Sequence, residues 1–264
     1  MDELYSGSEP RVVRCALVEG DWLFDYFHFG RGRRRLLVLF PSALVRGKRI
    51  VPSFHRWSWA PQFSDADVLC VSDPTLRLDE EILGGWFQGT ADDWVMPRVL
   101  RHIRHLTIGG EYREVVFCGS SLGGFAALQA GVLAPSVGFT SEECRVVSEN
   151  PQVSLPRYMW GAHMAKLARV SYGVDSLDLV EPRHLGRLDV ALLSEQCGHV
   201  PIGVVVVKES DAHHHQVHVK YLQQALAERA AERLRVDVIP ASLDASGHTP
   251  LSFKELSTRL ETLF

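Results

Sequence analysis

The chain has 264 residues, which is enough for one large α/β domain with a substantial core or for two small domains. Hydrophobic residues make up 46% and charged residues 23%, as in ordinary soluble globular proteins, and the net charge of −4 gives no reason to expect nucleic acid as a partner. No run approaches the roughly 20 apolar residues needed to span a bilayer. Residues 1–10 are polar and acidic, unlike a signal peptide, and the five scattered cysteines are typical of reduced, mostly buried thiols, so we expect a cytoplasmic protein.

Apolar runs rich in β-forming residues alternate with helical patterns along the chain. Strands are expected near residues 12–18, 22–29, 36–40, 68–71, 115–118, 146–148, 202–207 and 236–239. Helices are expected at about residues 92–106, 122–133, 158–170, 213–233 and 252–263. Two early strands with little helix between them, followed by strand–helix alternation, predict a mixed sheet that becomes parallel. The simplest interpretation is one domain over residues 1–264, with eight strands flanked by helices.

Two stretches interrupt this alternation. Residues 47–65 are rich in Trp, Phe, Pro and His, and residues 151–200 form a long insertion between the sixth and seventh expected strands. Both are expected to emerge at the carboxyl ends of strands, where open α/β sheets bind ligands. Loops of this length in a compact domain are usually functional, so residues 151–200 are a candidate lid or cap. The alternative is extra packing over the sheet edge.

The segment Gly119-Ser120-Ser121-Leu122-Gly123 lies directly between an expected strand and an expected helix. Gly-x-Ser-x-Gly in that context predicts a nucleophile elbow, a tight turn that presents its central serine to solvent. Side chains at the two glycines are expected to collide with the strand or helix beside them. Ser121 is the expected nucleophile because a glycine stands two residues to each side of it, and Ser120 is the rival. The alternative is a glycine-rich connection in which neither serine is reactive.

A serine hydroxyl is a poor nucleophile until a neighbouring base removes its proton. After an elbow of this kind the acid and then the histidine follow along the chain. Asp211 lies just past the apolar run 202–207 and is expected to orient the imidazole, with Glu209 and, more distantly, Asp244 as alternatives. His248 lies in a glycine-containing loop after the last expected strand, where it would act as general base and then as general acid. Its alternative is a histidine on a surface loop.

An oxyanion hole needs two N–H donors. Leu122 is expected to supply one, and the second is expected from the loop after the third strand. Pro41 has no N–H, so Ser42 or Ala43 must donate.

Three further residues are candidates to line a substrate pocket. Asn150 and Gln152 follow the sixth expected strand and would hydrogen-bond substrate or, equally, cap that strand and fix its turn. Trp160 belongs to an apolar cluster in the insertion, and its aromatic ring would suit a sugar, a lipid or a peptide.

Histidines crowd residues 213–218, and His214 and His218 would share one face of a helix. A zinc hydrolase has no need of a serine elbow, and the usual glutamate base between the histidines is missing. We therefore expect no metal and no cofactor, and interpret the cluster as a polar helix N-terminus near the active site. One of these histidines could still touch substrate or the triad acid.

These residues resemble those of an α/β-hydrolase-fold serine hydrolase, with Ser121, Asp211 and His248 in the family's order over nearly the whole chain from about residue 11. More loosely, Ser-Ser-Leu-Gly-Gly-Phe-Ala-Ala-Leu followed by Asn-Pro-Gln is similar to hydrolase-like proteins associated with bacterial surface polysaccharide biosynthesis. The chain has Pro41-Ser42 where many family esterases carry a His-Gly pair, which bears on the oxyanion hole. The resemblance implies a mostly parallel eight-stranded sheet with a small lid insertion.

The implied activity is cleavage of an ester or thioester through an acyl-serine intermediate. Acyl transfer to a sugar hydroxyl would use the same triad, so the expected partner is a small-molecule or saccharide acyl substrate. A peptidase is a further option. A third class of function is a binding protein that kept the fold and lost the activity.

Overall fold

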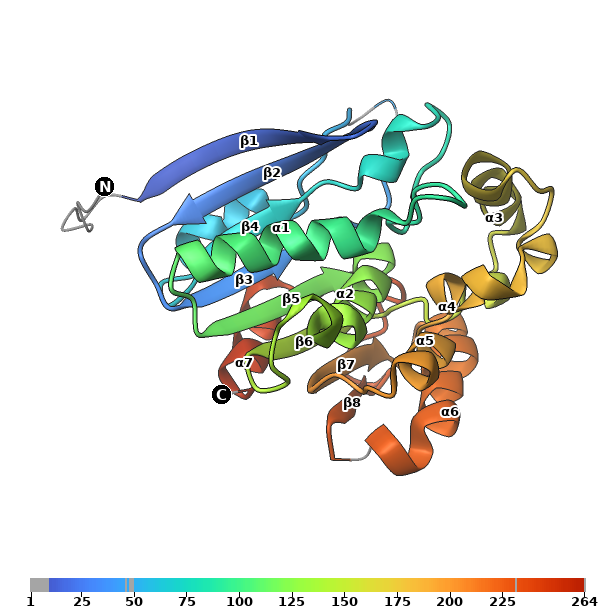
Figure 1. The fold of residues 1–264 in the computed structure, drawn as a ribbon. Coiled ribbons are helices and arrows are strands. Elements are labelled where there is room, and N and C mark those ends of the chain that lie inside the picture. The colour runs from blue at the N-terminus through green and yellow to red at the C-terminus, as the bar shows by residue number, and fades with distance from the viewer. Residues whose placement is uncertain (1–9, 46, 48–49, 231, 264) are drawn as a thin grey trace.

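The computed structural model describes residues 10–45, 47, 50–230 and 232–263. All eight expected strands are present, and they form one sheet in the order β1-β2-β4-β3-β5-β6-β7-β8 (Figure 1). Their bounds are β1 Arg11–Glu19, β2 Trp22–Gly30, β3 Arg35–Leu39, β4 Asp67–Val71, β5 Glu114–Ser120, β6 Cys144–Glu149, β7 Gly203–Lys208 and β8 Leu234–Ile239. β2 pairs antiparallel with β1 and with β4, and every other pair is parallel. The expected mixed sheet that becomes parallel, with the topology of an α/β hydrolase, is confirmed.

Burial follows the apolar runs of the sequence. All of β7 and four of the five residues of β3 are buried, because helices or loops cover both faces of a parallel sheet. β1 differs, since most of its side chains are exposed and it pairs only with β2 in the described part of the chain. The core therefore lies over the parallel strands, which also carry the functional loops.

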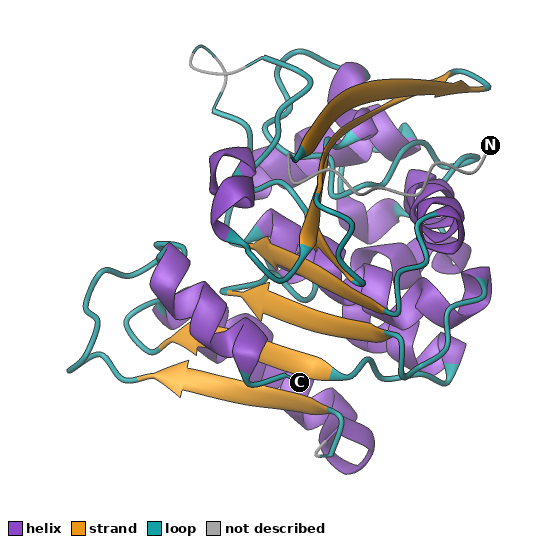
Figure 2. Cartoon of the chain, turned by 90° about the vertical axis from the view of Figure 1, so that its left-hand side faces the viewer, coloured by secondary structure: helices purple, strands orange, loops and turns teal. Residues whose placement is uncertain are grey.

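The described part of the chain contains seven α-helices, most of which flank the sheet. They are α1 Val95–Gly109, α2 Leu122–Leu133, α3 Gly161–Leu167, α4 Leu185–Leu188, α5 Val190–Cys197, α6 Lys220–Ala230 and α7 Phe253–Glu261. The main apolar cluster joins one face of the sheet to α1, α2 and α5, and a second cluster joins the other face to α7. Figure 2 shows α7, next to the C-terminus, on the near side of the parallel strands, with most other helices behind them.

Three helical regions differ from the sequence expectation. The helix expected at 158–170 begins at Gly161 and ends in a π-helical turn, Ala168–Tyr172. The helix expected at 213–233 contains a second π turn, His214–Val219, ahead of α6. α4 and α5 were not expected from the sequence, because both are short. Asp189 is the N-cap of α5, and its carboxylate accepts a hydrogen bond from Leu192 N at 3.0 Å.

The aromatic segment 47–65 lies between β3 and β4, so it follows the carboxyl end of a strand as expected. Residues 48 and 49 of this segment lie outside the described residues. A 3₁₀ turn, Trp57–Gln62, packs its buried Ala60 and the following Phe63 into the apolar cluster beneath α7. The ring of Phe63 lies 5.0 Å from that of Phe253 on α7. The segment's aromatic side chains mainly complete the core under one face of the sheet.

The insertion 151–200 is built from short helical turns whose apolar side chains join the main core, among them Val153, Leu155 and Leu167. Its last part, α5, packs against α2 as the crossover helix between β6 and β7. Figure 1 shows α3 lying beyond α4 and α5, away from the sheet. α5 therefore has the packing role considered for the insertion, and α3 also contributes Met164 and Leu167 to the main core.

Three of the five cysteines, Cys70, Cys118 and Cys144, are buried as expected, and all five are free thiols. Burial raises the pKa of Cys144 to about 12 and holds the pKa values of the other two well above the usual range. Cys15 and Cys197 are exposed, contrary to expectation, because one lies on the edge strand β1 and the other at the end of α5. None of the helices in the described part of the chain combines the length and apolar character that a membrane crossing requires.

Candidate active site

Ser121 lies on a strained turn between β5 and α2. Its backbone has φ 56° and ψ −116°, a conformation that L-residues rarely adopt and that elsewhere marks functional sites. A Cβ at Gly119 would lie 2.3 Å from the backbone of Gly123, and a Cβ at Gly123 would lie 2.7 Å from the carbonyl oxygen of Phe40. The turn therefore needs both glycines, although Gly123 makes room for the loop after β3 and not only for the adjoining elements. Ser120 is buried, with only 3% of its surface exposed.

The structure brings His248 and Asp211 to this serine. His248 Nε2 lies 3.0 Å from Ser121 Oγ, and His248 Nδ1 lies 2.5 Å from Asp211 Oδ2. Because a carboxylate only accepts, Nδ1 carries the imidazole proton and Nε2 is free to accept the serine proton. Burial favours the neutral acid, but hydrogen bonds from His214 and His248 outweigh it and hold the pKa of Asp211 well below its usual range. Asp211 is therefore a fixed negative charge behind the imidazole.

The alternative acids lie elsewhere. Glu209 accepts from the backbone N–H of Ala241 at 3.0 Å, and Asp244 pairs with Lys208 at 2.7 Å. Within the described residues, Asp211 is the carboxylate that contacts His248.

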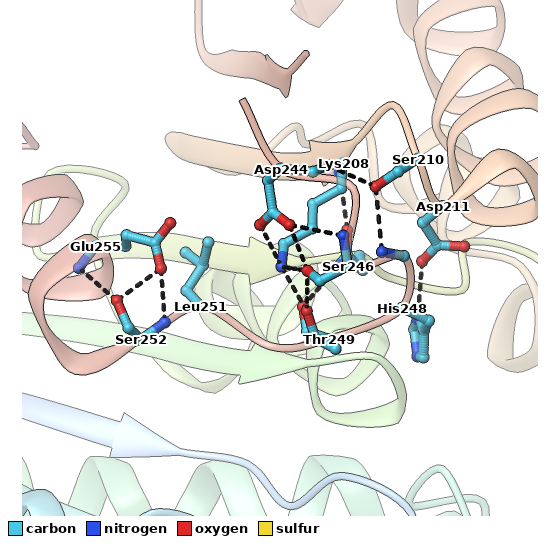
Figure 3. Close-up of polar contacts among 12 residues, drawn as sticks. Lys208, Ser210, Asp211, Asp244, Ser246, His248, Thr249, Leu251, Ser252 and Glu255 are labelled. Atoms are coloured by element: carbon cyan, nitrogen blue, oxygen red, sulfur yellow. Dashed lines mark hydrogen bonds and ion pairs between the residues drawn. The ribbon is translucent and has the colours of Figure 1, made fainter. Parts of the chain in front are cut away.

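His248 is carried by residues 240–251, here called the histidine loop, which joins β8 to α7 without regular structure. Lys208, the last residue of β7, is 3% exposed, and its ammonium donates to Asp244. It also donates to the hydroxyls of Ser246, at 2.9 Å, and Thr249, at 2.6 Å. All three ammonium protons thus have acceptors inside the loop, which Figure 3 shows gathered around the lysine.

Two more side chains hold the histidine loop. Ser210 donates to the carbonyl of Asp244 at 2.8 Å and accepts from Gly247 N at 3.2 Å (Figure 3). Asn150 donates to the carbonyl of Thr249 at 3.1 Å and accepts from Lys208 N at 3.0 Å. Both ends of the Asn150 amide are therefore used on backbone groups, as the strand-capping alternative predicts.

Gln152 reaches the nucleophile directly. Its Nε2 lies 2.9 Å from Ser121 Oγ and 2.9 Å from His214 Nε2, while its Oε1 accepts from the indole of Trp86 at 3.3 Å. His214 in turn places Nδ1 2.9 Å from Asp211 Oδ1 and stacks on His248 with ring centroids 4.1 Å apart. Of the crowded histidines, His214 is the one that touches the acid.

The metal-binding alternative can be compared with these contacts. Within the described ranges, Asp211, His214 and His248 bring one potential ligand atom each to within 4.8 Å of one another. Both imidazoles aim Nδ1 at the carboxylate and hydrogen-bond to it, so protons occupy the space between these atoms. His218 does not join them, because its Nδ1 accepts from Val153 N at 3.2 Å. In this cluster both imidazoles therefore donate a hydrogen bond to the carboxylate of Asp211.

The residues expected at an oxyanion hole lie beside the elbow. Leu122 begins α2 directly after Ser121, and the close approach of Gly123 to Phe40 brings the loop after β3 against the start of that helix. The Ser42 hydroxyl donates to the carbonyl of Ser120 at 3.0 Å. The N–H groups of Ser42 and Ala43 both belong to this adjoining loop.

Trp160 lies at the start of α3 and is 46% exposed. Its ring lies 5.5 Å from that of Tyr158, which lies 5.9 Å from the ring of His214. The ring of Trp160 is thus linked to the ring of His214 through one intervening ring, that of Tyr158.

Sequence reasoning missed Trp86, which donates a hydrogen bond to Gln152. Trp86 lies in a loop after β4 at φ 47°, and the buried carboxylate of Asp73 accepts from the N–H groups of its neighbours Gly85 and Phe87, at 3.1 and 3.2 Å. No periodicity marks this loop. Asp73, two residues after β4, and the later Gly84-Gly85-Trp86 are local turn signals that could have drawn attention to it.

No protein-family model matches the sequence, and no curated protein matches it. Solved structures do match its fold. The capsule O-acetyltransferase of Neisseria meningitidis serogroup A superposes with a TM-score of 0.66 at 15% identity, covering 94% of this chain and 93% of that one. An S-formylglutathione hydrolase from Agrobacterium tumefaciens gives a TM-score of 0.62 at 13% identity, covering 98% and 94%.

Acetyl xylan esterase 1 from a Thermoanaerobacterium species gives a TM-score of 0.59 at 17% identity, covering 100% of this chain and 87% of that one. At such identities the likeness concerns the fold, and the expected α/β-hydrolase fold is confirmed.

Proposed function

We propose that this protein cleaves an ester or thioester through an acyl-Ser121 intermediate, with Asp211 and His248 as its acid and base. The single observation that carries the proposal is the continuous contact from Ser121 Oγ to His248 Nε2, and from His248 Nδ1 to Asp211, at a strained elbow. A structural serine needs neither a positive φ nor an imidazole whose proton is held on the far nitrogen.

Acylation begins when Ser121 Oγ attacks the carbonyl carbon and its proton passes to His248 Nε2. The carbonyl oxygen becomes an oxyanion, held by the N–H of Leu122 and by that of Ser42 or Ala43. His248 then gives its proton to the departing alcohol or thiol, and the acyl-serine remains. Water then loses a proton to His248 and attacks the acyl carbon. The bond from that carbon to Oγ breaks, His248 returns the proton to Ser121 Oγ, and the carboxylic acid leaves.

The second candidate is acyl transfer, in which a saccharide hydroxyl takes the place of water. The half-exposed ring of Trp160, which packs on Tyr158 beside the histidines, favours it, because aromatic faces stack on the apolar faces of sugars. A capsule O-acetyltransferase and an acetyl xylan esterase are among the proteins that share the fold, which supports tests with acetylated saccharides.

The test is labelling with a fluorophosphonate, followed by intact-mass measurement. Wild type and Ser120→Ala are expected to take up one probe molecule, and Ser121→Ala and His248→Ala none. A folded wild type without an adduct at Ser121 contradicts the proposal. The two candidates are then separated with an aryl acetate: a sugar acceptor that becomes acetylated in proportion to enzyme indicates transfer, and acetate as sole acyl product indicates hydrolysis.

A further inference from the structure

The carboxylate of Asp211 accepts hydrogen bonds from two imidazoles, those of His248 and His214. His248 Nδ1 lies at one carboxylate oxygen, at 2.5 Å, and His214 Nδ1 lies at the other, at 2.9 Å. The two rings stack with an interplanar angle of 17°. His214 is 3% exposed, so solvent does not compete for its ring nitrogens. The second imidazole is therefore a built part of the site.

Gln152 closes a ring of hydrogen bonds from His214 back to the serine, and the partners fix where every proton lies. The indole of Trp86 can only donate, so Gln152 Oε1 is the acceptor end of the amide. The NH₂ end then faces Ser121 Oγ and His214 Nε2 and donates to both. His214 Nε2 must be unprotonated to accept this hydrogen bond. The imidazole proton of His214 is therefore on Nδ1, which donates a hydrogen bond to the carboxylate of Asp211.

We propose that Gln152 is a catalytic residue that donates a hydrogen bond to Ser121 Oγ, and that His214 and Trp86 are positioning residues that hold its amide for that purpose. This inference rests on the proposed function. Negative charge develops on Oγ as its proton leaves during acylation, and again when the bond from Oγ to the acyl carbon breaks and the electron pair returns to Oγ. A fixed donor at Oγ stabilises both transition states.

His214 can hold Gln152 only while its Nε2 is unprotonated. Burial, together with the positive charge that His248 acquires, lowers the pKa of His214 and outweighs the hydrogen bond to Asp211 and the charge of Asp211. His213 and His218 also face it, and the ring of Tyr158 covers the group from the insertion. At neutral pH the Gln152 amide therefore keeps its acceptor.

The first test is Gln152→Met, which keeps the length of the side chain and removes its donor. The second-order rate constant for fluorophosphonate labelling is expected to fall about 10- to 100-fold, as for loss of one hydrogen bond to developing charge. Gln129→Met is the matched control, because Gln129 is an equally buried glutamine whose Nε2 donates to the carbonyl of Arg187, outside the site. Its labelling rate is expected to stay within about twofold of wild type, which separates the loss of a donor from the loss of a buried amide.

Two variants of His214 separate positioning from mere support of Asp211. His214→Gln can place an amide oxygen near the Nε2 position, where it accepts from Gln152, and gives up the donor to Asp211. His214→Asn keeps a donor near Nδ1 and gives up the acceptor. We expect the Gln variant to retain most of the wild-type rate and the Asn variant to fall to the level of Gln152→Met, with circular dichroism showing both to be folded.

The reverse order would overturn the positioning role and make His214 a support for Asp211. An unchanged rate in Gln152→Met, with wild-type Ser121 labelled, would overturn the role of Gln152 and leave the proposed function standing. A folded wild type that is not labelled would overturn both.

Discussion

Ser121 and His248 lie 3.0 Å apart, but the chain holds them there by different means. The elbow, residues 119–124, is held by backbone packing: Gly119 and Gly123 leave no room for a methyl group, and the helix that follows is buried throughout. The histidine loop is mostly exposed and is held by polar side chains from the ends of β6 and β7.

Because of this difference, the elbow and the histidine loop should tolerate different kinds of substitution and different changes of pH. Packing of the elbow depends on shape, so it responds to added volume and hardly to charge or pH. The loop depends on individual hydrogen bonds and one ammonium group, so it tolerates changes in volume and responds to the loss of a single partner. Three predictions follow from this contrast, in order of decreasing effect.

Adding one methyl group should break the elbow. In Gly123→Ala the new Cβ would lie 2.7 and 2.9 Å from the carbonyl oxygens of Phe40 and Pro41. Neither backbone group can rotate away as a side chain would, so we expect the free energy of unfolding in urea to fall by about 3 kcal/mol. Gly161→Ala, at a site with no atom within 4 Å of the added Cβ, should stay within about 0.5 kcal/mol of wild type. An unchanged urea midpoint in Gly123→Ala would show that shape does not hold the elbow.

Removing one charge should loosen the histidine loop without unfolding the sheet. Lys208→Met keeps the apolar stem and loses the ammonium that holds Asp244, Ser246 and Thr249. Because a displacement of His248 by about 1 Å is enough to impair proton transfer, fluorophosphonate labelling should slow by about 100-fold.

Circular dichroism of Lys208→Met should stay that of the wild type. Lys254→Met, on the exposed side of α7, controls for the loss of a positive charge. Equal labelling rates in the two variants would contradict the view that Lys208 positions the loop.

Lowering the pH should destabilise the histidine loop at a higher pH than it destabilises the elbow. Hydrogen bonds from Lys208 and Ser246 lower the pKa of Asp244, so its contribution to stability is present above its unfolded pKa of about 3.9 and is lost as pH falls through the lower, folded value. The urea midpoint of wild type should exceed that of Asp244→Asn by a constant amount from pH 7 to about pH 5, and the gap should close below about pH 4. A gap that persists unchanged at pH 2 would mean that the Asp244 charge does not hold the loop.

Most strands could be predicted from sequence because they contain short apolar runs bounded by turns, and β3 and β7 are apolar except for one charged residue at an end of each. The elbow shape could be predicted in part, because Gly119 makes room for Gly123 four residues away, whereas the approach of Gly123 to Phe40 is a contact between distant segments. Asp211 and His248 could be named because a parallel sheet brings the carboxyl ends of its strands to one edge.

Contacts through space could not be predicted in this way. Four histidines between residues 213 and 218 look alike in sequence, and only the path of the helix decides that His214 meets Asp211. Arg56 is buried in an ion pair with Glu149 and donates to the carbonyl of Leu251 at 2.9 Å, joining three segments that are distant in the chain. The aromatic residues of 47–65 look like a binding surface in composition, but their place beneath α7 depends on packing that no local pattern encodes.

The π turn at His214–Val219 has a consequence for how related chains should be aligned. A π turn accommodates one residue more than an α turn, so side chains on either side of it keep relations that a regular helix would not allow. Here it lets His214 face Asp211 while Val219 and Leu222 face the core. Deleting one residue from this turn would rotate one group against the other by about 100°. A relative that is one residue shorter between Asp211 and Lys220 should therefore lack the second imidazole, so the length of this segment can serve as a marker when such chains are sorted.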